Sequence, residues 1–339
     1  MSSQEADTQY AFDGQLVFNG LYTTKLLNAG LDFDSVVEDE LVDFDKGEPG
    51  SPSRGYELLE FAEFATNSHI IGDNIKNSVA DIQAIRRKYE DWDSREDVDG
   101  NEVSVRSVNH YDIYWDVPEY LFVKGNKTQA SRASDVVKYT LGDYISATEI
   151  EFNPDFLMWL FYRFKSEETQ LNENFKINLL SDAEIEGEKE DRYGKRSRVD
   201  KSTDITKSTT VLIGILRNKD LTRIEGVFDV VDKFVKANIE VGGRVHVKAS
   251  HSIEGEEDVY RMSLAITFLR ELVSLYEDWI ELPGDDKYPP LEFFTELYEE
   301  CEKQGAELTF PYDDVVETYR QKRNQGEGRV KQSGIDEFK

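Results

Sequence analysis

The stretch 208–250 constrains the fold more than any other part of the chain. Residues 209–216 form a short, almost wholly apolar run rich in β-branched residues, which is typical of a strand buried on both faces. Over 221–235 the apolar residues recur every three or four positions, as on one face of a helix. Residues 239–249 return to an alternation of apolar and polar residues. The pattern predicts a strand-helix-strand unit whose two strands pair in parallel through a right-handed crossover.

The middle of this unit is its weak point. Gly226, Val227 and Val230 lower the helix propensity of the segment, so an all-antiparallel arrangement of 208–250 is the alternative. The expected fold class is α+β, or α/β, with a mixed sheet that contains the 208–250 unit and C-terminal helices packed on it. The best of these helices is expected at 258–280, where apolar residues line one face through six turns.

A length of 339 residues suggests two domains. We expect an N-terminal mixed α+β region at 1–145, a C-terminal α/β domain at 146–323 and a flexible tail at 324–339. Outside the 208–250 unit, the patterns predict helices at 56–65, 73–92, 131–141, 155–165, 291–304 and 312–323, strands at 103–108, 111–115, 120–123 and 148–152, and a hairpin between 175–186 and 205–216.

Charge is the outlier of the composition. The chain carries 69 acidic residues against 40 Lys and Arg, a formal net charge of −29, and the acids are spread through every segment. Such a surface predicts a protein adapted to a salt-rich cytoplasm, where carboxylates stay hydrated and their repulsion is screened. The alternative is an acidic interaction protein that mimics the phosphate array of a nucleic acid.

Localisation is predicted to be cytoplasmic, with no membrane partner. No stretch approaches the roughly 20 apolar residues of a membrane span, and the N-terminus lacks the basic start and apolar core of a signal peptide. The single cysteine, Cys301, excludes an internal disulfide, which agrees with a reducing compartment. Its position on a predicted helix indicates a packed structural thiol.

Catalytic motifs are missing from the sequence. There is no G-x-S-x-G, GxGxxG, C-x-x-C or P-loop spacing, the acids of 91–100 do not fit a calcium loop, and the four histidines lie far apart. We therefore predict no metal and no cofactor, and favour a binding protein over an enzyme. An enzyme of unknown reaction stays the alternative, with a site at the ends of the 209–216 and 239–249 strands. Its candidate residues are Asn218, Lys219, His251 and Glu254.

Two segments have a net positive charge, although the chain as a whole is acidic. Residues 192–207 hold six bases against two acids, and 319–334 hold five bases against one acid. Basic flexible segments commonly contact phosphate, so the prediction is a protein that contacts nucleic acid, or a nucleic-acid-bound complex. The candidate contacts are Arg192, Lys195, Arg196, Arg198, Lys201, Arg320, Lys322 and Arg323. The alternative is that these cations pair with the protein's own acidic surface or with a neighbouring subunit.

Overall fold

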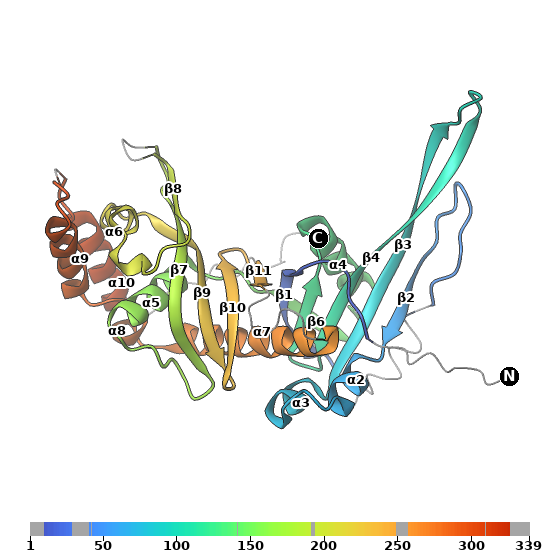
Figure 1. Cartoon of the computed structure of the whole chain (residues 1–339), viewed down its shortest axis with the longest axis horizontal. Helices are drawn as coiled ribbons and strands as arrows, with labels where there is room; N and C mark the ends of the chain where they lie inside the picture. The colour runs from blue at the N-terminus through green and yellow to red at the C-terminus, as the bar shows by residue number, and fades with distance from the viewer. Residues whose placement is uncertain are drawn as a thin grey trace. The chain divides into compact units, whose positions relative to one another are not determined.

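The computed structural model describes residues 10–28, 41, 43–140, 142–190, 194–248, 257–308 and 310–325. The fold is α+β, with eleven strands in an antiparallel sheet and a run of helices at the C-terminal end of the chain (Figure 1). This confirms the expected class and the C-terminal helices. The chain forms two compact units, Met1–Glu151 with Val230–Arg270 and Phe152–Asp229 with Glu271–Lys339.

The strands are β1 (Leu16–Leu26), β2 (Arg54–Leu59), β3 (Ile82–Glu96), β4 (Glu102–Asp116), β5 (Tyr120–Lys124), β6 (Ile145–Glu149), β7 (Phe175–Glu186), β8 (Arg196–Val199), β9 (Asp220–Val230), β10 (Lys233–Glu240) and β11 (Val245–Lys248). The helices are α2 (Phe61–Asn67), α3 (Asp73–Val79), α4 (Lys127–Thr140), α5 (Pro154–Lys165), α6 (Thr209–Leu216), α7 (Asp258–Glu281), α8 (Gly284–Lys287), α9 (Leu291–Lys303) and α10 (Asp313–Gln325), with a 3₁₀ turn η1 at Ile205–Lys207.

The first unit is built on antiparallel strands in the order β2-β3-β4-β5-β1-β11-β10. β11 pairs with the first half of β1 and β6 with its second half. Helix α4 packs on β1, β5 and β6, and α2 packs on α3 and β3. Buried side chains of the strands and of α4 form one apolar core, which includes Tyr22, Ile85, Ile113, Trp115, Leu121, Val123, Ala130 and Ala133.

The second unit contains strands β9, β7 and β8 in that order, with helices α5, α6, α8, α9 and α10. Helix α5 begins as its sequence predicts: the Asn153 side chain accepts a hydrogen bond from the Asp155 N–H, and Pro154 occupies the first turn. Helix α6 packs closely on β7, because a Cβ on Gly214 would lie 2.1 Å from Ile185. The predicted helices at 291–304 and 312–323 are confirmed as α9 and α10.

The predicted strand-helix-strand unit is wrong in its order. Residues 209–216 form helix α6, and the predicted helix over 221–235 is strand β9 with the start of β10. A short apolar run fits a buried helix as well as a buried strand, and the pattern of burial in α6 is helical. In β9 the buried residues Ile224, Phe228 and Val230 alternate. Ile224 and Phe228 are four apart, a spacing that fits both periods.

Parallel pairing in this stretch is also wrong. Strands β10 and β11 pair antiparallel, with Ala237 opposite Val247. The antiparallel alternative is therefore the better description, because the β-branched residues there favour extended backbone. The alternation predicted for β11 is confirmed, with Val245 and Val247 buried and the residues between them half-buried.

Three further predictions fail. The helix predicted over 56–65 is the end of strand β2 followed by helix α2. The helix predicted over 73–92 ends at Val79, and the chain continues as strand β3, although Ile75, Val79, Ile82 and Ile85 have helical spacing. The hairpin partner of β7 is β8, and not residues 205–216.

The first passage of the chain between the units falls at Glu151 and Phe152, near the boundary expected at 145 and 146. The return of Val230–Arg270 to the first unit has no counterpart in the sequence pattern. Helix α10 reaches Gln325, and the rest of the predicted tail lies outside the described residues.

Candidate functional site

The most distinctive feature of the first unit is the hairpin of β3 and β4. Its strands are each 15 residues long and pair in unbroken register from Ile82 opposite Asp116 to Glu96 opposite Glu102. β2 covers the outer edge of β3 only as far as Tyr89, and β5 covers β4 only from Asp112 onward. Beyond these points the hairpin extends as two strands (Figure 1). We call residues 91–107 the distal hairpin, which holds six acids and two bases.

A buried carboxylate fixes the base of the distal hairpin. The Glu90 side chain accepts hydrogen bonds from the backbone N–H groups of Gly47 (3.1 Å) and Ser53 (3.0 Å). It also accepts bonds from Arg106 Nε at 2.6 Å and Trp92 Nε1 at 3.2 Å. These contacts tie the loop before β2 to both strands of the hairpin.

The environment of Glu90 changes its acidity. Burial by itself raises the pKa of this carboxyl, but the donors from Ser53, Gly47, Arg106 and Trp92 together lower it from 4.5 to about 2. The ionised group therefore stabilises the fold at neutral pH. This contribution is lost as the pH falls from 4.5 towards 2, where the carboxylate takes up its proton.

The tip of the hairpin is an ordered turn. The Asp97 side chain accepts hydrogen bonds from the backbone N–H groups of Asp99 (2.8 Å) and Asn101 (2.9 Å), and Gly100 adopts a left-handed φ of 80°. These bonds, with the surrounding amide donors, lower the pKa of Asp97. The turn therefore organises the tip through hydrogen bonds within the hairpin itself.

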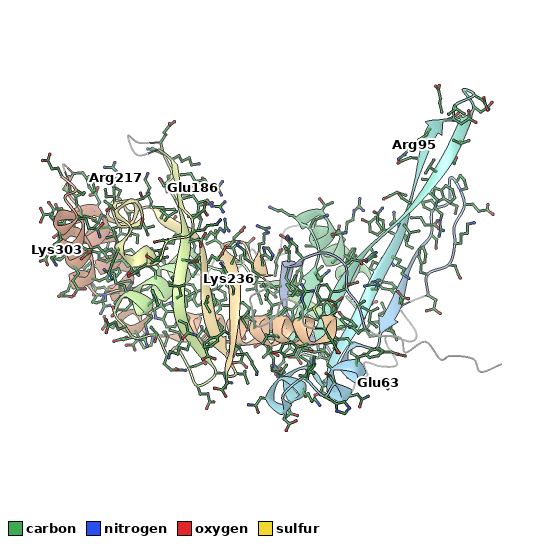
Figure 2. The ribbon with its side chains drawn as sticks, viewed as in Figure 1. Glu63, Arg95, Glu186, Arg217, Lys236 and Lys303 are labelled. Carbon is green, nitrogen blue, oxygen red and sulfur yellow. The ribbon has the colours of Figure 1, made fainter. Side chains whose placement is uncertain are left out.

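The two faces of the distal hairpin differ. Val103 and Val105 lie on one face and remain 40% and 38% exposed. Trp92, Arg106 and Glu102 lie on the opposite face, on which Trp92 is directly across from Arg106. Figure 2 shows Arg95 on this outer part of the hairpin, where it is the neighbour of Val103. The distal hairpin thus exposes apolar side chains at a place where they add nothing to the core.

The first basic segment lies on and beside the β7–β8 hairpin, where most of its cations have acidic partners. Arg196 binds Glu184 through its Nε at 2.6 Å, Arg198 binds Asp200 at 2.6 Å, and Lys195 lies 3.2 Å from Glu186. These carboxylates raise the pKa of both arginines, chiefly through side-chain hydrogen bonds. Lys201 follows β8 and donates its backbone N–H to Asp182. Arg192 lies outside the described residues.

The described part of the second basic segment, residues 319–325, belongs to helix α10, and its cations hold that helix in the second unit. Lys322 Nζ lies 2.6 and 2.8 Å from the two oxygens of Asp155, which also accepts a bond from the buried Tyr319 hydroxyl at 3.0 Å. Arg323 donates to the backbone oxygens of Asp285 and Tyr288. Arg320 pairs with Glu317 one turn earlier. Pairing within the chain, the alternative that the sequence left open, accounts for these contacts.

Two of the four residues proposed for an enzyme site, Asn218 and Lys219, belong to the described part of the chain. Asn218 donates to Thr318 at 3.2 Å, whereas the buried Lys219 donates to the Gly194 oxygen at 2.5 Å. His251 and Glu254 lie outside the described residues. The expected position at the ends of two parallel strands is wrong, because 209–216 is a helix. Lys219 does line a hollow of about 270 Å³, together with Ser197, Thr209, Thr210, Ile213, Gly214 and Arg217.

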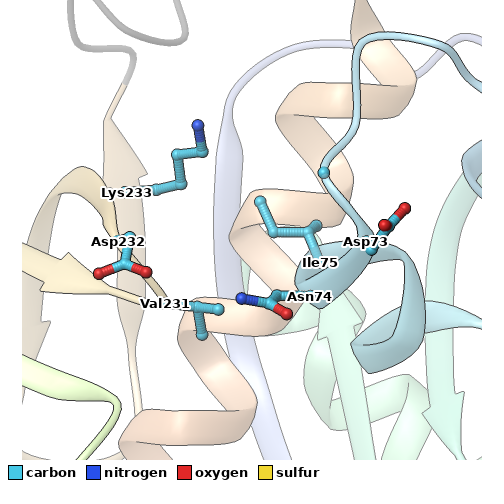
Figure 3. A pocket seen from close by; sticks show the side chains of 7 residues that line it. Asp73, Asn74, Ile75, Val231, Asp232 and Lys233 are labelled. Atoms are coloured by element: carbon cyan, nitrogen blue, oxygen red, sulfur yellow. The ribbon is translucent and has the colours of Figure 1, made fainter.

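A second hollow, of about 350 Å³, belongs to the first unit (Figure 3). It is lined by Gly72, Asp73, Asn74, Ile75, Val231, Asp232 and Lys233. Val231 and Asp232 have φ angles of 50° and 62° in the turn that joins β9 to β10. A positive φ is unusual for a β-branched residue such as Val231. Two residues with positive φ in succession fit a tight hairpin turn. The hollow offers one acid and one base from this turn but no nucleophile beside a base.

The described residues contain no group of three or more His, Cys, Asp or Glu residues placed to hold a metal ion. Cys301 is buried in α9, and burial raises the pKa of its thiol to about 11, which suits a packing role. Across the same residues, no helix is both long and apolar enough to span a membrane.

Sequence reasoning missed the distal hairpin as a site. The sequence predicts a strand at 103–108, but most of its partner strand falls within the helix predicted at 73–92 or in no predicted element. The usable signal was Asp99-Gly100, a common turn pair, between two segments of alternating residues.

Comparison of this mixed α+β chain with protein-family models and with curated proteins gave no match.

Proposed function

We propose that this chain is an acidic, soluble, cytoplasmic binding protein that docks a protein partner through the distal hairpin. The exposure of Val103 and Val105 on a two-stranded extension carries the proposal. A hairpin without a third strand is only marginally stable in water, so its length is better explained by a contact than by folding. Apolar residues framed by charged ones are typical of an interaction surface.

Deletion of the outer hairpin tests this proposal. Residues 93–105 are replaced by Asn-Gly, which joins Trp92 to Arg106 in their observed register and keeps the Glu90 cluster. We expect an unchanged melting temperature, because the deleted part has no core. Proteins that co-purify with the wild-type chain should bind the deletion variant at least about tenfold more weakly when re-measured as purified pairs, as expected when a central contact is lost.

The control for the deletion is Val227→Ser on β9, a half-buried strand residue in the other unit, which changes an apolar residue without touching the hairpin. Equal binding by the wild type and the deletion variant would refute a role for the hairpin in docking.

Nucleic-acid binding through β8 is the second candidate. Arg196 and Arg198 are two residues apart on one strand, so they share a face, and their side chains remain 63% and 49% exposed despite their carboxylate partners. A phosphate strand that displaced Glu184 and Asp200 would meet both guanidinium groups.

Neutralising these two arginines tests the second candidate. The variant Arg196→Gln/Arg198→Gln should bind nucleic acid more weakly and should lose about 0.9 in log–log salt slope per contact on duplex, or about 0.7 on single strands. Arg95→Gln/Arg244→Gln removes two other exposed arginines and is the matched control. Fluorescence anisotropy at low salt measures both. Absence of binding by the wild type to any duplex or single strand would eliminate this candidate.

A further inference from the structure

The two outer edges of the β3–β4 hairpin are protected unequally. The edge of β3 is covered by β2 up to Tyr89 and beyond that carries Asp91, Asp93 and Glu96, charges that discourage pairing with another strand. The edge of β4 has no strand partner in the described part of the chain between Glu102 and Tyr111. Its backbone N–H and C=O groups at alternate positions therefore face outward.

The sequence of the β4 edge favours pairing with another strand. Residues 102–108 read EVSVRSV, with one acid and one base, three β-branched valines, and neither glycine nor proline. Within a chain of net charge −29 this is a neutral stretch with high strand propensity. Natural edge strands usually carry repelling charges or proline against such pairing, whereas this edge has no proline and its two charges, Glu102 and Arg106, are opposite in sign.

The same edge is complementary to itself. If two copies pair antiparallel about a two-fold axis through Ser104, each Glu102 lies opposite the other copy's Arg106, and each Val103 lies opposite the other copy's Val105. Opposite residues then share a face, as an antiparallel ladder requires. A two-fold axis through Val105 instead places Glu102 opposite Val108 and loses both charge pairs.

Arg106 can take part without releasing Glu90. Its Nε atom donates to Glu90, and the guanidinium group has two further nitrogens for a second carboxylate. Glu102 accepts a hydrogen bond from the Ser94 hydroxyl within the hairpin, which holds its carboxylate on the same face as Arg106.

We propose that the partner of the distal hairpin is a second copy of this chain, joined edge to edge along β4 from Glu102 to Arg106. This inference deepens the proposed function and rests on it, since it names the occupant of the same surface. The interface is isologous, so it closes as a dimer and leaves no unpaired copy of the edge. Mutual repulsion of two acidic chains opposes the contact at low salt and is screened at high salt.

Charge reversal at one position tests the pairing. At molar potassium chloride the wild type is expected to have twice the 39.1 kDa chain mass by light scattering. Glu102→Arg places two arginines opposite each other at both ends of the contact, so it should weaken dimerisation by at least about tenfold. The control, Glu96→Arg, makes the same charge change directly across the hairpin on β3 and should leave the dimer intact.

A cysteine pair tests the register. Ser104→Cys places two thiols face to face on the two-fold axis, within the distance range of a disulfide. Ser94→Cys is the matched control, because Ser94 is directly opposite Ser104 on the hairpin but belongs to the β3 edge. Cys301 is the only native cysteine and is buried. We expect a disulfide-linked dimer from Ser104→Cys and none from Ser94→Cys.

A monomeric wild type at every salt concentration, an unaffected Glu102→Arg dimer, or equal cross-linking of the two cysteine variants would each overturn this inference. The proposed function fails separately: it is refuted when deletion of residues 93–105 changes no binding at all. If the wild type is a monomer and binds a different protein that the deletion variant does not bind, the self-pairing is overturned and the docking role still holds.

Discussion

The melting temperature of this protein is expected to rise by on the order of 10 °C between low and molar potassium chloride. A net charge of −29 repels itself across the whole chain when the Debye length is about 30 Å, at 0.01 M salt, and much less when it is about 3 Å, at 1 M salt. A melting temperature that is flat over this range would reject the adaptation to salt.

The effect of charge repulsion on the melting temperature can also be measured at a single helix, α9. Glu292, Glu296 and Glu300 are four residues apart on its exposed side, where like charges destabilise a helix. Glu296→Lys should raise the melting temperature at low salt and reduce its dependence on salt. Glu296→Gln is the control, with a smaller effect of the same sign. An equal response of all three proteins to salt would show that ion exclusion from the surface, and not charge repulsion, causes the stabilisation.

Asp112→Asn is expected to destabilise the first unit by about 3–5 kcal/mol. The Asp112 side chain is only 2% exposed, and Arg86 binds it through Nε at 2.7 Å and a terminal nitrogen at 3.2 Å. The amine of Lys124 lies in the same buried region, where desolvation lowers its pKa and Asp112 opposes that shift. Loss of the carboxylate leaves the Arg86 guanidinium group, on a side chain that is only 18% exposed, without its charged partner.

Hydrogen exchange of the backbone amides of β3, β4 and β5 during urea unfolding measures the loss of stability of the first unit. The double variant Arg86→Met/Asp112→Leu should recover most of it, since replacing both charges removes the unpaired group. Asp93→Asn, an exposed acid on the same hairpin, should change the stability by less than about 0.5 kcal/mol. An Asp112→Asn effect as small as that of the control would contradict the structural role of the buried pair.

Several features were readable from the sequence because they depend on neighbouring residues. The start of α5 is determined locally by two residues. Asn153 accepts a hydrogen bond from a free N–H group of the first turn, and Pro154 is the first residue of the helix. Helix α7 follows from an apolar face repeated over many turns, more than a strand of ordinary length can hold. The α+β class and the acidity needed no tertiary information either.

Other features were decided only by tertiary contacts. Residues 209–216 fit a strand or a helix equally well in isolation, and the close approach of Gly214 to Ile185 on β7 accompanies the helix. Likewise, Arg86 falls within the helix predicted at 73–92 but lies on β3, where Asp112, 26 residues away, binds it.

The two basic segments show the same division most clearly. Their positive charge is a property of the sequence, but the partners of Arg196 and Lys322 lie 12 and 167 residues away, at Glu184 and Asp155. The exposed edge of β4 is likewise invisible in sequence, because it depends on where β5 stops pairing with β4. Local propensity and composition act over a few residues, whereas the pairing of charges and the openness of an edge depend on which distant segments the fold brings together.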